Sequence, residues 1–158
     1  MKPVTDIDRS APVIVRADIE IDAPLEEVWE LHSQVSAWPD WFPDIRIAEI
    51  DGPFAPGAHI TWGAHGYEEL FPARIGLIEH QHRTAWDGSN AGIYGIHAFS
   101  FTRRGNKIHV ETAESWDTNP GPHAVSTLQT FLQNWLSNLK DTAEGICSRK
   151  VCRRQPRT

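Results

Sequence analysis

The sequence has little cysteine and no long apolar run. Cys147 and Cys152 are its only cysteines, and their spacing fits neither a zinc site nor a redox motif, so we expect reduced thiols rather than a disulfide framework. No stretch approaches the roughly 18 apolar residues that a membrane-spanning helix needs. The segment Met1–Ser10 is polar and lacks the apolar run of a secretory signal. These absences predict a cytoplasmic protein without membrane insertion.

Motifs that bind phosphate, activate a nucleophile or hold a metal are also missing. The sequence contains no glycine-rich phosphate loop, no Gly-x-Ser-x-Gly elbow and no cysteine in a setting typical of a nucleophile. His80 and His82 stand at alternate positions, which share a face on a strand, but the sequence places no third ligand beside them. We therefore predict no metal site and no cofactor.

Basic residues are scarce outside the last ten positions. Those ten positions hold five of the 15 lysines and arginines and no acid, so residues 1–148 carry 10 basic and 21 acidic side chains. Their net charge is −11, against −6 for the whole chain, which argues against nucleic-acid binding because that relies on a basic face. The basic segment 147–158 could contact RNA, acidic lipid or a partner, but a solvated terminal tail is the simpler interpretation. We assign it no function.

The clearest pattern in the sequence is a strand followed by a helix. Apolar residues alternate with charged ones from Val13 to Ile21, as in a half-buried strand. Asp22 is a candidate N-cap, and Pro24 fits the first helical turn, where its missing N–H would have no partner. An aromatic segment, Trp38-Pro39-Asp40-Trp41, follows, and its proline limits the length of the helix.

Strand patterns continue through the middle of the chain, and one long helix closes it. Alternating or β-branched runs between turn residues predict six further strands, with a break or bulge near Pro72 and Gly76 and a turn at Asp87–Asn90. These strands are expected at residues 45–50, 59–62, 67–78, 83–86, 93–101 and 108–116. Apolar residues at helical spacing from Leu128 to Leu139 predict the final helix, which we expect to end near Gly145.

These features together resemble a known family. The first strand, Asp22-Ala23-Pro24 with Val28-Trp29, the Trp38–Trp41 segment and the amphipathic C-terminal helix are similar to the polyketide cyclase/dehydrase family of the START-like superfamily, over residues 13–145. The resemblance implies an α+β helix-grip fold, in which a curved antiparallel sheet of about seven strands wraps around the long C-terminal helix. It also implies two short helices after the first strand and an internal hydrophobic cavity. The expected organisation is a flexible segment 1–10, one START-like domain at 11–146 and the basic tail 147–158.

Aromatic residues are the best candidates for a ligand site. The chain has seven tryptophans, and flat aromatic walls suit flat ligands such as polycyclic, phenolic or sterol-like molecules. The alternative is that most of these rings simply fill the core. The predicted ligand-binding residues are Trp38, Trp41, Trp62, His65, Tyr67, Trp86, Tyr94, Phe99, Trp116, His123, Leu128, Phe131 and Trp135.

His97 and Glu114 are the candidate catalytic residues. On the predicted hairpin, register brings both onto the inner apolar face as neighbours. A histidine beside a carboxylate in an apolar pocket can have its tautomer fixed and its pKa moved, which would suit general acid–base chemistry in enolisation, aldol closure or dehydration. The alternative is a buried pair that only joins two strands.

Three functions are consistent with the sequence. The resemblance implies a cofactor-independent polyketide cyclase, aromatase or dehydratase that acts on a hydrophobic, aromatic or polyketide-derived small molecule and works partly by positioning. The same pocket could belong to a non-catalytic carrier of a lipid-like or sterol-like molecule. The third possibility is a protein-interaction module with a closed interior. We expect a monomer or homodimer with a hydrophobic small-molecule ligand.

Overall fold

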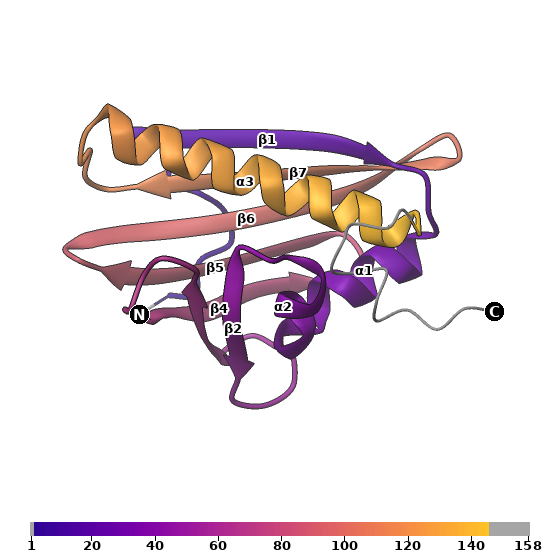
Figure 1. Ribbon diagram of the computed structural model, residues 1–158, viewed down its shortest axis with the longest axis horizontal. Coiled ribbons are helices and arrows are strands. Elements are labelled where there is room, and N and C mark those ends of the chain that lie inside the picture. The colour runs from indigo at the N-terminus through magenta and orange to yellow at the C-terminus, as the bar shows by residue number, and fades with distance from the viewer. Residues whose placement is uncertain (1, 146–158) are drawn as a thin grey trace.

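The computed structural model describes residues 2–145, which form one curled antiparallel sheet with a long helix against its concave side (Figure 1). The seven strands follow the order β1-β7-β6-β5-β4-β3-β2 across the sheet. Their bounds are Val13–Ile21 (β1), Ile45–Ile50 (β2), His59–Ala64 (β3), Phe71–Glu79 (β4), Arg83–Asn90 (β5), Ile93–Arg104 (β6) and Lys107–Trp116 (β7). The chain therefore runs as a meander from β2 to β7, and β1 adds to the β7 edge.

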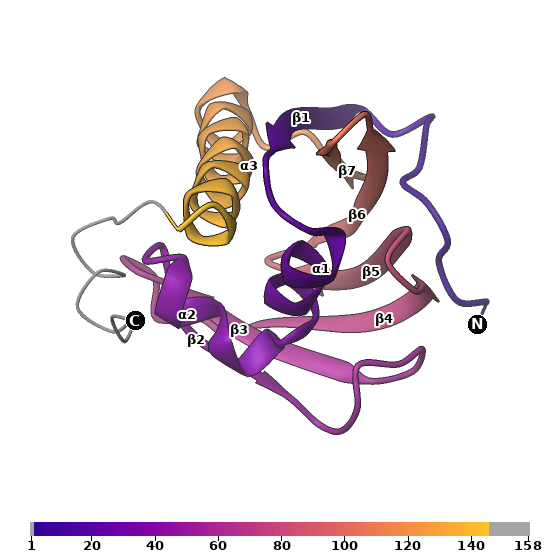
Figure 2. The same ribbon diagram turned by 90° about the vertical axis from the view of Figure 1, so that its right-hand side faces the viewer.

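Three short helical segments follow β1, and one long helix ends the described chain. Their bounds are Leu25–Ser33 (α1), the 3₁₀ segment Val35–Ala37 (η1), Trp38–Trp41 (α2) and Pro122–Ala143 (α3). Figure 2 shows the sheet end-on, with α3 on the open side of the curl beside β1, and α1 across one end. The predicted α+β helix-grip fold is thus confirmed. No helix among residues 2–145 is long and apolar enough to cross a membrane.

The start of α1 differs from the prediction. The N-cap position belongs to Pro24, whose carbonyl accepts bonds from the N–H groups of Glu27 and Val28, and no side chain caps the helix. Asp22 is not the N-cap: its own N–H donates to Oε2 of Glu144, at 2.7 Å. The loop after β1 is therefore tied to the far end of α3, and the proline fixes the helix entry because its φ is already near the required value.

Two strand ends also differ from the prediction. The strand β5 continues through Asp87 to Asn90, and the chain turns at Ala91 and Gly92, both with positive φ. The strand β4 begins at Phe71 rather than Tyr67, and its register shifts between Ile75 and Leu77, as expected for a bulge near Gly76.

The histidines 80 and 82 do not share a strand face. They flank Gln81, which has a φ of 59° in the turn between β4 and β5. The ring of His80 packs instead against that of Trp29, with 5.4 Å between centroids. Among residues 2–145 no group of three histidine, cysteine or acidic side chains could hold a metal ion.

The N-terminal segment lies along the outer, convex face of the sheet (Figure 2). Ile7 is buried there, Asp8 donates its N–H to the Ser115 hydroxyl at 3.0 Å, and Arg83 donates to the carbonyl of Thr5 at 2.7 Å. Flexibility of residues 1–10 stays a prediction, but these contacts show that described residues of the segment cover part of the sheet. The basic tail 147–158 with both cysteines, and the predicted domain end at residue 146, lie outside the described residues.

Candidate functional site

His97 and Glu114 face each other on the inner side of the sheet. They are register partners in the β6–β7 hairpin, as predicted, and Nδ1 of His97 lies 3.5 Å from Oε1 of Glu114. The side chain of His97 is 8% exposed and that of Glu114 is 20% exposed. The other carboxyl oxygen, Oε2, accepts a 2.7 Å hydrogen bond from Nε1 of Trp116. Solvent or a ligand therefore reaches the carboxyl more readily than the imidazole.

Burial favours the neutral form of both groups. It lowers the pKa of His97 to about 3, because the charged imidazolium is poorly solvated among aromatic rings. It raises the pKa of Glu114 to about 7, although the Trp116 bond stabilises the carboxylate and opposes the rise. A carboxyl that titrates near neutral pH is suited to give and take protons.

Aromatic side chains fill the interior around His97. Its ring centroid lies 4.5 Å from that of Phe99, 5.3 Å from that of Trp135 and 5.4 Å from that of Trp86. Trp38, only 1% exposed, packs in turn on Trp135 at 5.0 Å. These predicted ligand-binding residues are therefore brought together, but as a packed wall behind the His97–Glu114 pair.

A second buried histidine lies deeper in the same interior. His32, on α1, is fully buried, and its Nε2 lies 2.9 Å from the hydroxyl of Thr84. Its ring stacks on Trp86, and burial lowers its pKa to about 3. The sequence places His32 on the apolar stripe of a helix, and a histidine on such a stripe was the available signal for a buried polar group.

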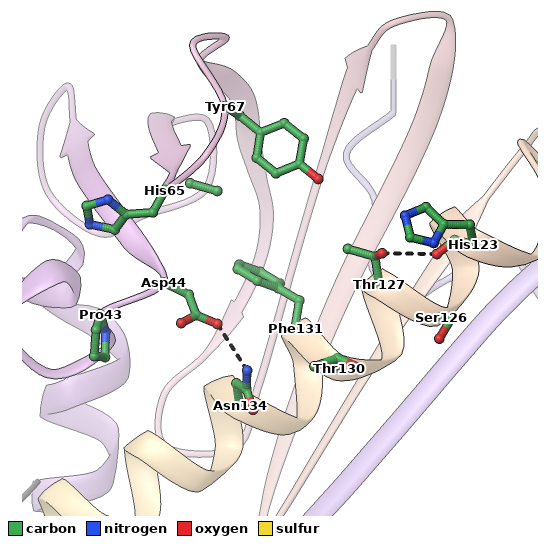
Figure 3. A pocket seen from close by; sticks show the side chains of 11 residues that line it. Pro43, Asp44, His65, Tyr67, His123, Ser126, Thr127, Thr130, Phe131 and Asn134 are labelled. Carbon is green, nitrogen blue, oxygen red and sulfur yellow. Dashed lines mark hydrogen bonds between the residues drawn. The ribbon is translucent and has the colours of Figure 1, made fainter.

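An open pocket of about 520 Å³ lies between α3 and the loop that follows β3 (Figure 3). Its walls come from the first half of α3, from the β3–β4 connection and from the residues just before β2. The lining residues are Pro43, Asp44, Ala64, His65, Tyr67, His123, Ser126, Thr127, Thr130, Phe131 and Asn134. Asn134 donates from Nδ2 to Oδ2 of Asp44 at 3.1 Å, which joins the two walls.

Four predicted ligand-binding residues line this pocket: His65, Tyr67, His123 and Phe131. The polar residues beside them were not predicted. Ser126, Thr130 and Asn134 recur every four residues and so form one ridge of α3. In the sequence, the pocket wall is visible only as a row of polar residues beside the apolar face of the helix. A solvent-exposed helix surface has the same pattern.

The remaining predicted residues lie elsewhere. Trp41 is buried against Phe42, and Leu128 packs between α3 and β1. Trp116 binds Glu114, as described above. Tyr94 lies on the outer face of the sheet, where its hydroxyl donates to Oδ2 of Asp87 at 2.5 Å. Tyr94 is therefore on the opposite side of the sheet from His97.

Phe131 links the pocket to the His97–Glu114 pair through ring contacts. Its ring lines the pocket, stacks on Trp62 at 5.5 Å and contacts Trp135 edge-on at 5.8 Å. Trp135 then touches His97, so that two aromatic rings separate the pocket from the pair. Trp62 itself packs against Phe71, at 4.6 Å, and is not among the residues that line the pocket.

Solved structures share this fold at low sequence identity. A hypothetical protein of Helicobacter pylori superposes with a TM-score of 0.75 at 16% identity, covering 90% of this chain and 99% of the other. A START superfamily protein of Mycobacterium smegmatis gives 0.71 at 15% identity, covering 85% and 99%. A norcoclaurine synthase point mutant of Thalictrum flavum, in complex with a transition-state analogue, gives 0.64 at 13% identity, covering 83% and 93%.

Sequence comparison assigns the family. No curated protein sequence matches the chain. Residues 12–144, which include nearly all of the sheet and helices, match the family described as polyketide cyclase / dehydrase and lipid transport. The resemblance seen in the first strand, the tryptophan segment and the last helix is thereby confirmed. The chain belongs to the polyketide cyclase / dehydrase and lipid transport family.

Proposed function

We propose that the protein is a cofactor-independent cyclase or dehydratase that binds a neutral, hydroxyl-bearing aromatic molecule and moves protons with Glu114. The observation that carries the proposal is the Glu114 carboxyl itself. It stands on the inner face of the sheet, 3.5 Å from His97, and burial raises its pKa to about 7. An acid that is half protonated near neutral pH is well matched to general acid–base catalysis.

The pocket lining supports this class of ligand. The pocket lining includes the hydroxyls of Tyr67, Ser126, Thr127 and Thr130 together with the ring of Phe131 (Figure 3). Hydroxyl groups donate and accept hydrogen bonds, and an aromatic ring offers a stacking surface. The lining contains one carboxylate and neither lysine nor arginine, so it offers no permanent cation for a fatty-acid carboxylate or a phosphate. A neutral phenolic ligand therefore fits better than an anionic lipid.

A dehydration illustrates the chemistry that Glu114 would perform. The neutral carboxyl gives its proton to the hydroxyl on the carbon β to a substrate carbonyl as that carbon–oxygen bond breaks, and water leaves. The resulting carboxylate takes the proton from the α-carbon, and a carbon–carbon double bond forms. Glu114 returns to its neutral form, so the cycle needs no cofactor. The norcoclaurine synthase neighbour supports the proposal only in that an enzyme uses the same fold.

A carrier function is the second candidate, because the pocket and the catalytic pair are separate. Phe131 and Trp135 stand between them, and His97 is 8% exposed. A molecule held in the pocket without movement of Phe131 would not touch Glu114. Such a protein would bind its ligand and release it unchanged.

Binding and turnover of a ligand panel test the proposal. We would titrate the protein with neutral polyphenols, fatty acids and sterols by calorimetry and then examine each bound compound by mass spectrometry. We expect the polyphenols to bind, and Tyr67→Phe and Thr130→Val to weaken binding about 3- to 10-fold each, since each removes one hydroxyl. Ser137→Ala, an exposed change on α3 outside the pocket, is the matched control.

The variant Glu114→Gln separates the two functions. We expect it to bind the ligand as the natural protein does and to lose turnover by about 100-fold or more. Ligand recovered unchanged from the natural protein would support the carrier instead. Preferential binding of fatty acids, or no binding by any compound, would contradict the proposed ligand class.

A further inference from the structure

The hydroxyl of Thr112 has a defined hydrogen-bond direction. Its Oγ1 lies 3.0 Å from the backbone carbonyl of Ala98, and a carbonyl oxygen only accepts, so the threonine donates its single proton there. The same Oγ1 lies 2.7 Å from Nε2 of His97. Because the proton of the hydroxyl is already used, Oγ1 must accept the second bond. The Nε2 atom of His97 therefore carries a hydrogen.

We propose that Thr112 is a positioning residue that fixes His97 as its Nε2–H tautomer and thereby makes Glu114 the group that holds the proton of the pair. In a neutral imidazole one nitrogen donates and the other accepts. With the hydrogen on Nε2, Nδ1 carries the lone pair and lies 3.5 Å from Oε1 of Glu114. Thr112 is itself 2% exposed, so water does not compete for its hydroxyl.

Glu114 must then carry a proton on Oε1. A carboxylate oxygen facing the Nδ1 lone pair would place two acceptors opposite each other in a buried site, which is unfavourable. A protonated Oε1 turns the same contact into a donor facing an acceptor. The other oxygen, Oε2, accepts from Trp116 and is therefore not the protonated atom. The Nε2–H tautomer of His97 therefore stabilises the neutral Glu114 carboxyl, and the neutral carboxyl stabilises that tautomer.

The other groups around His97 do not alter this assignment. His32 approaches from α1 and Glu114 from β7, and these are the titratable groups that interact with His97. His32 is held neutral by burial and has its own threonine partner, Thr84. The sides of the ring towards β5 and α3 are closed by Trp86 and Trp135, which do not titrate.

The catalytic meaning of this arrangement rests on the proposed function, because a resting neutral Glu114 is the acid that the dehydration needs. The arrangement itself is testable without any ligand. In protein labelled with ¹⁵N-histidine, we expect the His97 ring at pH 6 to carry a hydrogen on Nε2 and none on Nδ1. In protein with ¹³C-labelled glutamate carboxyls, we expect Glu114 to titrate near pH 7.

Substitution of Thr112 gives the decisive comparison. Thr112→Val keeps the side-chain shape but removes the acceptor, so we expect His97 to move its hydrogen to Nδ1 and donate to the Glu114 carboxylate. The Glu114 titration should then fall by about one pH unit or more. Thr112→Ser keeps the hydroxyl and should restore both natural readouts. Thr84→Val removes the equivalent bond of His32 and should leave Glu114 unchanged, which controls for a damaged core.

Two results would overturn the proposal. One is a hydrogen on Nδ1 of His97 in the natural protein, and the other is an unchanged Glu114 titration in Thr112→Val. A failure of the proposed function looks different: the ligand panel would show no binding or no turnover while the tautomer and the titration stay as expected. If turnover exists, the alkaline limb of its pH profile, where Glu114 loses its proton, should move with the Glu114 titration in Thr112→Val, which a purely structural role of Thr112 would not cause.

Discussion

At the scale of single residues, burial favours the neutral form of three titratable side chains in the interior. His32 and His97 each have a threonine partner and are enclosed by aromatic rings, and burial lowers both pKa values to about 3. Glu114 has the opposite response, because burial raises the pKa of an acid. Since all three groups favour the neutral form, the folded protein and the unfolded chain bind different numbers of protons, and stability must depend on pH.

The direction in which stability changes with pH follows from the directions of the three pKa shifts. Between pH 6.5 and 3 the unfolded chain protonates both histidines and the folded protein does not, so acid costs stability, about 2 kcal/mol per histidine between pH 8 and pH 5. Between pH 4.5 and 7 the folded protein keeps the Glu114 proton that the unfolded chain loses, so this residue gains stability in acid, about 2.5 kcal/mol over the same interval. We expect a net loss of about 1–2 kcal/mol from pH 8 to pH 5.

Glu114→Gln should expose the histidine contribution alone. Without the opposing carboxyl, the loss from pH 8 to pH 5 should grow to about 4 kcal/mol, measured from urea unfolding at the two pH values. Glu49→Gln, an exposed change on β2, should keep the natural pH dependence. An identical pH dependence in natural protein and Glu114→Gln would mean that the Glu114 carboxyl is ionised in the fold.

At the scale of elements, α3 is held differently on its two sides. Towards β1, Leu128 and Leu132 pack on Val13 and Val15 in a separate apolar cluster. Towards β2, a single side-chain hydrogen bond from Asn134 joins the helix to the residue before the strand. The pocket lies on this second side, where the helix also packs on Phe42 through the rings of Phe131 and Trp135.

This asymmetry predicts unequal costs for two nearby substitutions on α3. Leu132→Ala should destabilise the protein by about 2–5 kcal/mol, because the side chain is fully buried and leaves a cavity. Asn134→Ala should cost less than about 1.5 kcal/mol, the usual net value of one hydrogen bond. Urea unfolding measures both, and equal losses would show that the pocket side also anchors the helix.

At the scale of the whole molecule, the two faces of the sheet have separate roles. The inner face carries His97 and Glu114, and the outer face is covered in part by the N-terminal segment through Ile7 and the Ser115 hydroxyl. Near the bulge in β4 this cover is close: a methyl group added at Gly76 would lie 2.3 Å from the carbonyl oxygen of Val4. The sheet and the segment therefore fit each other without spare room at this point.

The same scale explains what the sequence could predict. Alternation from Val13 to Ile21 and the apolar spacing of α3 report which face is buried, and alternation along the hairpin led to the correct register of His97 and Glu114. Tyr94 was separable from His97 by strand parity alone, since an odd spacing places them on opposite faces. The pocket was only partly predictable: four of its lining residues were expected, but its polar wall consists of residues such as Thr130 that a pattern assigns to solvent, and only the fold sets the β3–β4 loop against them.

The close contact at Gly76 predicts that the N-terminal segment and the sheet contribute jointly to stability. Gly76→Ala should destabilise the full chain by about 1–3 kcal/mol, because the added methyl meets backbone atoms of Val4 that have no room to move. In a chain that lacks residues 2–9 the same substitution should cost less than about 0.5 kcal/mol, since the three nearest atoms are gone. Urea unfolding of the four proteins gives the coupling. If Gly76→Ala destabilises the shortened chain as much as the full chain, the strain lies within the sheet. The N-terminal segment would then not be packed tightly against the sheet at Gly76.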